Sequence, residues 1–428
     1  MSRTRSGSGI RRRIGTRPRL GARLRPGTRS RGARGGTQPP EAASPTPTWA
    51  LIAGGGTAGH VLPGICIARE ITGRGAPKHA VHFVGSVRGV GTRLVAEAGF
   101  ALTALPGRGL RRGISPSSLA ANATAAAELA RASVQAILVV MRRKPAVVVG
   151  LGGYASVAVG VAAALMRVPL VITEQNAVPG LANRLLSRLA AHAATAFEDT
   201  DLPRAAWTGN PVRAEVLAAD RPAGRPAARA ALGVDEECPM VAVFGGSLGA
   251  RTINEAVAGA LDLWRDRGDL HIRHIAGRRY YEDLSGRTPA APARAVHYDL
   301  VAYEDDMATV YAAADLVVSR AGATTVAELA AVGMPSVLVP LPGAPGDHQT
   351  ANARGLEAAG GAVLVGDGEL DAARLVAEVD ALIEDPGRLD SMACAARSLA
   401  RPGAAGAVVD LMESCARFRR PSDPEAAG

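Results

Sequence analysis

The 428-residue sequence predicts an α/β protein of two domains, each with a parallel sheet covered by helices. Two observations predict this fold class. Short, continuous apolar runs alternate with alanine-rich stretches of helical character, and continuous runs are typical of parallel strands buried on both faces. A strand followed by a glycine-rich turn also occurs twice, with the turns at 54–59 and 245–250. The sequence therefore predicts two Rossmann-like, doubly wound domains in tandem that face a cleft.

Residues 1–48 differ in composition from the rest of the chain. They contain twelve arginines, no lysine and one acid, Glu41, so this segment carries a net +11 while the whole chain carries +10. Its few apolar side chains cannot offset the entropy cost of ordering, and we expect a disordered tail. Two interpretations stay open: an arm for nucleic acid or anionic lipid, or an extension without a role. The remaining chain, at −1, gives no reason to expect nucleic-acid binding.

The expected strands fall into two series. The first domain, at 49–210, contains WALIAGGG (49–56), AVHFVGS (80–86), AVVVGLGG (146–153) and PLVITEQ (169–175), with a helix over 116–143. The second domain, at 211–385, contains PMVAVFGG (239–246), HIRHIAG (271–277), VVSRAGA (317–323) and PSVLVPLP (335–342). Residues 386–428 are expected to form helices, broken at Pro402-Gly403, that pack back on the first domain and end in a short tail.

The cysteines and the apolar runs indicate in which cellular compartment the protein resides. Four cysteines occur without a C-x-x-C pair or zinc-ligand spacing, which predicts reduced, small apolar side chains. No apolar stretch reaches the length of a membrane span, and the N-terminus has no signal-peptide core. We therefore expect a cytoplasmic protein that at most contacts a membrane surface.

The turn at 54–59 fits G-x-G-x-x-G, and its backbone N–H groups, at the start of a helix, would face an anion. Binding of NAD also requires an acid at the end of the second strand. Gly85 and Ser86 stand there instead, which disfavours an NAD oxidoreductase. The alternative interpretation is that both glycine-rich turns only connect a strand to a helix.

The stretch 319–342 is the most informative part of the second series. Gly322 to Thr325 would begin a helix and offer N–H and hydroxyl donors to a phosphate. Glu328 follows in the first turns, where a carboxylate can accept two hydrogen bonds from a ribose diol; the alternative is a surface residue favoured by the helix dipole. Polar residues also follow strands at 174–184 and 346–354, where ligand-facing loops lie.

These segments together resemble one family. The ordered motifs are GGGTAGH (54–60), GLGGYAS (150–156), EQNAVPGLANR (174–184), GNPVR (209–213), GGSLGA (245–250), SRAGATTVAE (319–328) and DHQTANA (347–353). From about residue 49 to 420 the chain resembles the MurG family, the N-acetylglucosaminyltransferases that make lipid II of bacterial peptidoglycan. The resemblance implies a GT-B fold and inverting transfer of N-acetylglucosamine from UDP-N-acetylglucosamine to the muramic acid 4-hydroxyl of lipid I, at the cytoplasmic face of the cell membrane.

The resemblance also implies the site residues. Arg213 and Ser247 map to the diphosphate, and Glu304 maps where the family contacts uracil through its backbone. The donor-binding loop and helix map to Ala323, Thr324, Thr325, Val326, Ala327 and Glu328, with Glu328 on the ribose. Gln349 maps to the sugar hydroxyls. On the first domain, the donor side maps to Thr57, Ala58, Gly59 and Asn176.

Inversion requires a base for the acceptor proton and a means of stabilising the departing UDP. Helix N-termini and Arg213 can supply the second, so no metal and no cofactor are expected. His60 has a suitable ordinary pKa for the base, or it binds the acceptor diphosphate; Glu174 is a second candidate base. The D-x-D at 199–201 is interpreted as a chance match in a connecting loop.

Two features depart from the family pattern. Ala58 stands where many members have glycine, which fits only if a helix begins there, because alanine disfavours positive φ. The basic residues expected to ring a membrane patch are present (Arg108, Arg111, Arg112, Arg142, Arg143 and Lys144, with Ile114 and Leu119), but the segment between them is alanine-rich without an aromatic side chain. We therefore expect membrane contact that is weaker than in the family, or that the arginine-rich tail assists.

Other functions remain as rivals. One is a different GT-B transferase of UDP-sugars or a UDP-N-acetylglucosamine epimerase, which loss of the GGGTAGH motif would have favoured. Another is a non-catalytic UDP-binding protein, which would bind UDP without turnover.

Overall fold

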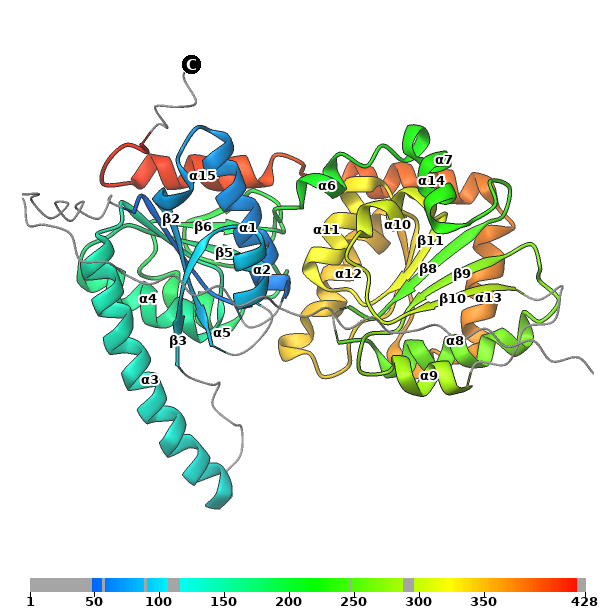
Figure 1. The fold of residues 1–428 in the computed structure, drawn as a ribbon, viewed down its shortest axis with the longest axis horizontal. Coiled ribbons are helices and arrows are strands. Elements are labelled where there is room, and N and C mark those ends of the chain that lie inside the picture. Colours follow the sequence, from blue (N-terminus) through cyan, green and yellow to red (C-terminus); the bar gives the residue numbers. More distant parts are fainter. Residues whose placement is uncertain are drawn as a thin grey trace, which may run out of the picture. The chain divides into compact units, whose positions relative to one another are not determined.

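The computed structural model describes residues 48–55, 58–87, 91–106, 116–246, 248–287 and 296–421, without the side chains of 116–127 and 129. Within these ranges the chain forms two parallel sheets, each flanked by helices (Figure 1). The strands of one sheet all precede residue 208, and those of the other all follow residue 239. We call these two parts the first half and the second half.

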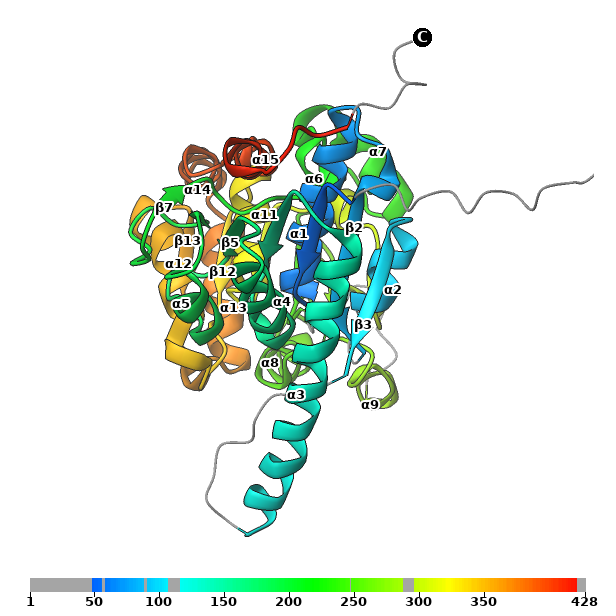
Figure 2. The ribbon, with the colours of Figure 1, turned by 90° about the vertical axis from the view of Figure 1, so that its left-hand side faces the viewer.

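The first half contains the sheet ordered β3-β2-β1-β4-β5-β6-β7, in which every pair of neighbours is parallel. Its strands are β1 (Ala50–Ala53), β2 (Val81–Ser86), β3 (Ala101–Leu105), β4 (Val147–Gly150), β5 (Leu170–Glu174), β6 (His192–Thr195) and β7 (Ala205–Trp207). Its helices are α1 (Ala58–Gly73), α2 (Gly91–Glu97), α3 (Pro116–Arg143), α4 (Gly153–Leu165) and α5 (Leu181–Leu186). The N-terminal part of α3 extends beyond the strands in two perpendicular views (Figures 1 and 2).

The second half repeats this arrangement in the order β10-β9-β8-β11-β12-β13, again fully parallel. Its strands are β8 (Met240–Phe244), β9 (His271–Ile275), β10 (His297–Val301), β11 (Leu316–Ser319), β12 (Ser336–Leu338) and β13 (Ala362–Leu364). Its helices are α6 (Ala214–Leu217), α7 (Arg221–Leu232), α8 (Arg251–Leu263), α9 (Tyr281–Arg287), α10 (Met307–Ala313), α11 (Ala323–Val332), α12 (His348–Ala359), α13 (Ala372–Ile383) and α14 (Pro386–Ser398).

The strand order explains where a ligand can bind. Chain order reverses between β1 and β4 in one sheet and between β8 and β11 in the other. In open α/β sheets, ligands bind outside the carboxyl ends of the strands at this reversal. The carboxyl ends of β1 and β4 lead into Gly54 and Leu151, and those of β8 and β11 lead into Gly245 and Arg320. Both glycine-rich turns therefore lie at a reversal point.

Apolar runs and local signals account for these elements. Val147, Val148 and Val149 are fully buried, as a central strand covered by helices on both faces requires. Helix α10 begins where Asp306 accepts a hydrogen bond from the Thr309 backbone N–H at 3.1 Å. Helix α11 ends at Gly333, whose φ of 60° suits the left-handed C-cap. These two helices carry Tyr311 and Glu328 of the site described below.

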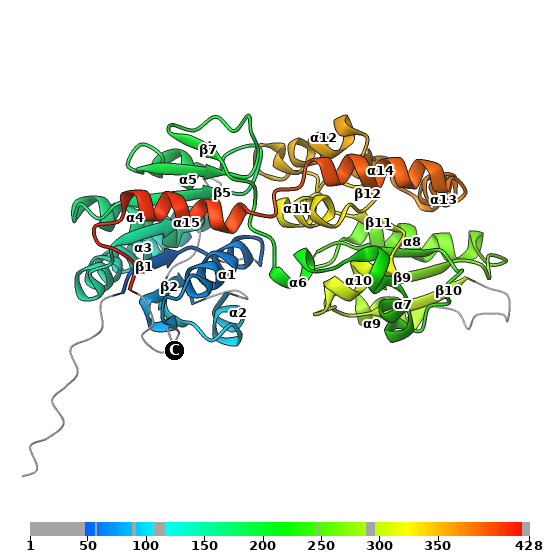
Figure 3. The same ribbon diagram turned by 90° about the horizontal axis from the view of Figure 1, so that it is seen from above.

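The last helix, α15 (Ala404–Cys415), packs on the first half beside α1, as Figure 3 shows. Val408, Val409 and Met412 are buried in the same apolar cluster as strand β1. Arg74 at the end of α1 pairs with Asp410 at 2.6 Å. The chain thus crosses from the second half back to the first between α14 and α15.

Most expected elements are confirmed. All eight predicted strands, the helix over 116–143 and the helix break around Pro402 are present, although helix α15 ends at Cys415. Helix α1 begins at Ala58, as an alanine there requires, and β2 ends at Ser86. The sequence interpretation missed β3, β6, β7, β10 and β13.

Several expectations about composition can be compared with the described residues. The four cysteines are free thiols. Among the described residues, no helix is long and apolar enough to cross a membrane. The same residues contain no group of three or more histidine, cysteine or carboxylate side chains arranged to hold a metal ion. The arginine-rich tail and residues 107–115 of the basic patch lie outside the described residues, as does the side chain of Leu119.

Candidate active site

The first helix presents an unusual carbonyl group to the second half. Pro63 lies inside α1 and has no N–H, so the carbonyl of Gly59, four residues earlier, lacks its helical donor. The Thr324 hydroxyl lies 3.4 Å from this oxygen and donates to it from the first turn of α11. The two helix N-termini that the motifs predicted to bind the donor are thereby brought together. Thr57, which precedes α1, lies outside the described residues.

His60, in the first turn of α1, packs against the backbone that follows β4. A Cβ placed on Gly152 would lie 3.2 Å from Cδ2 and 3.3 Å from Nε2 of His60, and 3.8 Å from Nδ2 of Asn183. Gly152 also has a φ of 96°, a conformation that side-chain-bearing residues rarely adopt. Only glycine at this position lets the imidazole and Asn183 approach so closely.

Burial controls the proton affinity of His60. Loss of hydration lowers the pKa of His60 below its ordinary value, the Glu174 carboxylate opposes this shift, and His348 adds to it. The neutral imidazole is therefore favoured near pH 7. This is the state that a general base requires.

Glu174, the other candidate base, is held by four hydrogen bonds at the end of β5. Oε1 accepts from the Asn176 backbone N–H at 3.0 Å and from its Nδ2 at 3.3 Å. Oε2 accepts from the Gly180 N–H at 3.0 Å and from Asn183 Nδ2 at 2.9 Å. The carboxylate is buried and orders the loop 175–180. These contacts favour a positioning role for Glu174 and leave His60 as the better candidate base.

Asn352 links this loop to the second half. Its Oδ1 accepts from the Ala177 backbone N–H at 2.8 Å. Its Nδ2 donates to Asn176 Oδ1 and to the Ala321 carbonyl, both at 3.2 Å. The side chain is fully buried on α12, so three partners satisfy it without water. Asn176, predicted on the donor side, is therefore anchored from the opposite half.

A buried ion pair connects the segment before α6 with α11. Arg213 Nε donates to Glu328 Oε1 at 3.0 Å, and Nη2 lies 2.9 Å from the same oxygen. The Tyr311 hydroxyl donates to Oε2 at 3.0 Å. Burial raises the pKa of Glu328, while Arg213 and the Tyr311 hydrogen bond oppose the shift. Glu328 is 4% exposed, which rules out the alternative of a solvated surface carboxylate.

The remaining candidate donor residues lie on α11 and α12. Ala323, Thr324 and Thr325 form the first turn of α11, and Val326 and Ala327 follow. Gln349, in the first turn of α12, accepts from the Leu341 N–H through Oε1 at 2.9 Å, which leaves its amide N–H groups as donors. Ser247 lies outside the described residues.

The side chain of Glu304 is occupied by protein partners. Its Oε2 accepts from Arg273 Nη2 at 2.7 Å, and its Oε1 accepts from the Asp306 N–H at 3.1 Å. This arrangement agrees with a role through the backbone alone.

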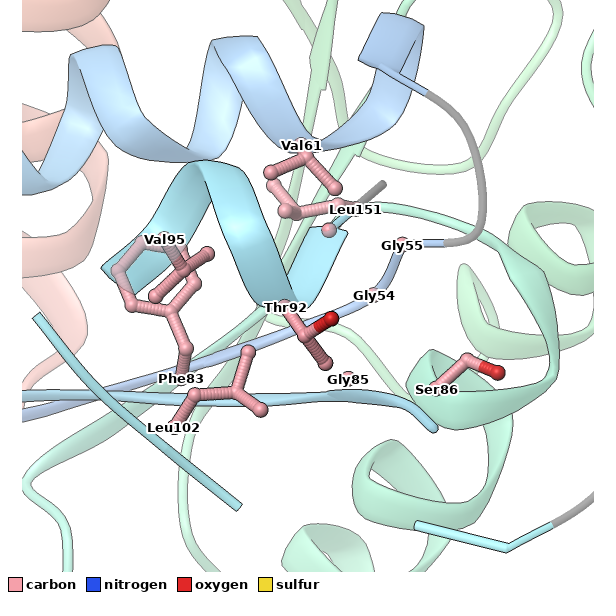
Figure 4. A pocket seen from close by; sticks show the side chains of 11 residues that line it. Gly54, Gly55, Val61, Phe83, Gly85, Ser86, Thr92, Val95, Leu102 and Leu151 are labelled. Carbon is pink, nitrogen blue, oxygen red and sulfur yellow. The ribbon is translucent and has the colours of Figure 1, made fainter. Parts of the chain in front are cut away.

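A small cavity lies under the first glycine-rich turn, bounded by β2, α1 and α2 (Figure 4). Its volume is about 10 Å³, too small for a nucleotide. Gly85 lines it, and a Cβ there would be in ordinary van der Waals contact with the Gly54 carbonyl oxygen, at 3.4 Å.

Sequence reasoning missed three of the residues that build this site: Pro63, Gly152 and Tyr311. Gly152 lies within a motif that was recognised, but the functional roles were assigned to other residues. Tyr311 carries no local signal, because its partner lies 17 residues away on another helix.

Comparison with known proteins defines the class. Residues 50–195 match the glycosyltransferase family 28 N-terminal domain, and residues 240–407 match the glycosyltransferase family 28 C-terminal domain. Solved epimerases share the fold at low identity, for example a putative UDP-N-acetylglucosamine 2-epimerase from Listeria monocytogenes, at a TM-score of 0.57 and 13% identity over 88% of this chain and 99% of that one. Fold and matched domains together define a family 28 glycosyltransferase.

Individual relatives define the family more narrowly. Over 378 residues the chain is 40% identical to the UDP-N-acetylglucosamine–N-acetylmuramyl-(pentapeptide) pyrophosphoryl-undecaprenol N-acetylglucosamine transferase of Desulforudis audaxviator, covering 86% of this chain and 98% of that protein. It is 44% identical to the protein of the same name from Alkalilimnicola ehrlichii, covering 84% and 97%. The crystal structure of Acinetobacter baumannii MurG matches at a TM-score of 0.66 and 29% identity, over 86% and 100%. The chain belongs to this MurG family of N-acetylglucosamine transferases.

Proposed function

We propose that the chain transfers N-acetylglucosamine from UDP-N-acetylglucosamine to the muramic acid 4-hydroxyl of lipid I, with inversion, to give lipid II. The observation that carries this proposal is the contact between Thr324 and Gly59. It joins the N-termini of α1 and α11 at the reversal points of the two sheets. A diphosphate bound there would meet N–H groups and the positive ends of two helix dipoles.

The second half is proposed to hold the donor. Arg213 would stabilise the leaving diphosphate with its remaining N–H groups, while its other edge orients Glu328. Glu328 would accept from the ribose diol through the lone pairs that Arg213 and Tyr311 leave open. Ser247 and the first turn of α11 would donate to phosphate, and Gln349 would donate to the sugar hydroxyls. The Glu304 backbone would contact the base.

The first half is proposed to hold the acceptor and the catalytic base. Neutral His60 would take the proton of the acceptor hydroxyl as that oxygen attacks C1 of the sugar and the bond from C1 to the UDP oxygen breaks. Asn183, which packs against Gly152 as His60 does, would help to position the imidazole. The charge of Glu174 would raise the pKa of His60. Thr57, Ala58, Gly59 and Asn176 would complete the donor side.

The domain division and the membrane contact also belong to the proposal. We place the first domain at 49–210, the second at 211–385 and the C-terminal helices after 386. A polyprenyl-linked acceptor requires that the enzyme reach the cytoplasmic face of the membrane peripherally. Arg142 and Lys144, exposed at the end of α3, would contribute attraction to anionic lipid.

Release of UDP by the full chain tests the function. Purified protein is given UDP-N-acetylglucosamine with and without a lipid I analogue, and UDP and disaccharide are quantified. Release that depends on the analogue and matches the disaccharide formed supports the transferase. The matched variants are Arg213→Ala, expected to lose activity, and Arg287→Ala, whose exposed ion pair with Glu255 joins α9 to α8.

The rival functions predict other products. An epimerase would convert the donor into its C2 epimer without an acceptor, which NMR of the sugar nucleotide detects. A non-catalytic protein would bind UDP but form no UDP from UDP-N-acetylglucosamine. Either result would overturn the proposal.

A further inference from the structure

A second, larger cavity lies where the chain passes between the two halves. Its volume is about 490 Å³, within the range of small-molecule sites. One crossing, at 208–213, connects β7 to α6, and the other, at 399–403, connects α14 to α15 (Figure 3). Both crossings line the cavity, through Asn210 and Val212 on one and Leu399 and Arg401 on the other.

The two crossings are in direct contact at the edge of this cavity. Gly209 has a φ of 83°, and a Cβ on it would lie 2.4 Å from Arg401 Cβ. The Arg401 guanidinium carbon lies 3.6 Å from the centre of the Trp207 ring, a cation–π geometry. Glycine at 209 is therefore required for the crossings to pass each other and for the cavity wall to form.

The cavity lies against another face of α11 than the Arg213–Glu328 pair. It lies against α11 through Ala323, Val326, Ala327 and Ala330, whereas Glu328 of the same helix faces Arg213 and Tyr311. Three residues predicted for the donor, Ala323, Val326 and Ala327, thus line this second cavity.

Asn210 is the observation that points to a ligand. It is 5% exposed, and neither Nδ2 nor Oδ1 has a hydrogen-bond partner among the described residues. A buried amide without partners costs free energy, so a group that donates and accepts beside it would be bound favourably. Asn210 belongs to the GNPVR motif, and the proposed transfer reaction gives it no role.

The rest of the lining defines the chemistry of the ligand. Phe197, Trp207 and Leu356 offer aromatic and aliphatic surface. The charged residues at the wall are two acids, Glu198 and Asp199, and two arginines, Arg354 and Arg401, so no net charge is selected. A carboxamide pairs in two hydrogen bonds with an N–H that lies next to a C=O, as in a cyclic amide.

We propose that this cavity is a binding site for an uncharged, flat, apolar molecule that carries a cyclic amide, with Asn210 pairing to the amide edge. The site does not depend on the proposed transfer reaction. Quinolin-2(1H)-one is a suitable probe, and 2-methoxyquinoline, of similar shape but without the N–H donor, is its control.

The test measures binding of both compounds to the full chain by calorimetry and ligand-observed NMR. Saturable binding of the quinolinone at least about tenfold tighter than of the methoxy compound is expected, since only the quinolinone has an N–H to donate to Asn210 Oδ1. Asn210→Leu is expected to abolish this preference.

A filling variant keeps the test valid if Asn210→Leu does not fold. Gly355, on α12, lines the cavity, and a Cβ there meets no atom within 4 Å, so Gly355→Phe would fill the space at little strain. It is expected to weaken quinolinone binding at least about tenfold. Gly286→Phe, at another exposed helical glycine with no atom within 4 Å, is the control and should bind normally. Equal binding of the two compounds, or unchanged binding in Gly355→Phe, overturns the proposal.

Discussion

Arg213 and Glu328 form a buried ion pair in which Nε and Nη2 both lie within 3.0 Å of Oε1. The pair joins the segment before α6 to the helix that presents Thr324 toward the first half. Tyr311 occupies the other carboxylate oxygen, at 3.0 Å. A carboxylate this deeply buried requires these partners, because unpaired burial of a charge is costly. The three side chains therefore act as one unit that fixes the position of the Arg213 guanidinium.

Removing the cation should affect stability and donor binding together. Arg213→Ala leaves Glu328 buried without a counter-charge, and we expect a loss of about 3–5 kcal/mol of unfolding free energy and a raised KM for UDP-N-acetylglucosamine. Tyr311→Phe removes one hydrogen bond and should cost about 1 kcal/mol with little change in KM. Denaturant unfolding and steady-state kinetics measure both. Equal effects of the two variants would contradict the assigned roles.

Gly152 should be needed for activity more than for folding. Gly152→Ala places a Cβ 3.2 Å from the His60 ring, and we expect kcat to fall at least about tenfold as the ring is displaced. Gly153→Ala is the matched control, since its φ of 79° imposes similar backbone strain while its Cβ would lie 3.5 Å from the Gly55 carbonyl oxygen. Comparable losses of kcat in both variants would attribute the effect to strain alone.

The pH dependence of turnover should report the buried histidine. Because burial lowers the pKa of His60, the acid limb of kcat is expected below about 6.5, the ordinary histidine value. His348→Ala removes a positive charge that contributes to this lowering, so the limb should move to higher pH. His60→Gln should abolish the limb and most of kcat. If His60→Gln instead raises the KM for the lipid I analogue and leaves kcat intact, the imidazole binds the acceptor diphosphate.

Glu174 should behave as a positioning residue. In Glu174→Gln the side-chain N–H₂ would face N–H donors that the carboxylate accepts from in the native chain. We therefore expect about 1–3 kcal/mol of destabilisation. Loss of the negative charge should also move the acid limb of kcat to lower pH, because Glu174 raises the pKa of His60. Glu237→Gln, exposed and far from the loop in sequence, is the control. Loss of the limb together with kcat would make Glu174 the base.

The fold could be predicted largely because its central strands are continuous apolar runs. Val147 to Val149 and Val317 to Val318 signal buried parallel strands without any knowledge of their neighbours. The missed strands lack this signal. β10 is an edge strand whose HYDLV sequence mixes polar and apolar residues, and β7 has only three residues, two of them exposed.

The site could be predicted where its residues are contiguous and not where they meet only in space. The first turn of α11 and the loop after β5 were identified from short motifs. The pairing of Thr324 with the carbonyl that Pro63 leaves open depends on two helices 265 residues apart. Nothing in the sequence next to Pro63 indicates this contact, and only the packing of α11 against α1 gives Pro63 a function.

Asn352 should couple the two halves, and two substitutions distinguish coupling from simple loss of packing. Asn352→Ala removes three hydrogen bonds to Asn176, Ala177 and Ala321, and we expect about 2–3 kcal/mol of destabilisation and a higher donor KM, because Asn176 loses its anchor. Asn352→Asp retains the acceptor for the Ala177 N–H but places a carboxylate 3.2 Å from two oxygens.

The aspartate variant should therefore be at least as destabilised as the alanine variant at neutral pH, although it is nearly isosteric with the native residue. Its stability should recover as the pH falls and the carboxylate takes up a proton, since the protonated group can donate to one of those oxygens. The alanine variant should show no such recovery relative to the native chain. Thr350→Ala, on the same helix, is the control, since the Thr350 hydroxyl donates to Asp347. Urea unfolding at pH 5 and pH 7.5 provides the measurement, and an aspartate variant as stable as the native chain at both values would show that Nδ2 of Asn352 contributes nothing to the link between the halves.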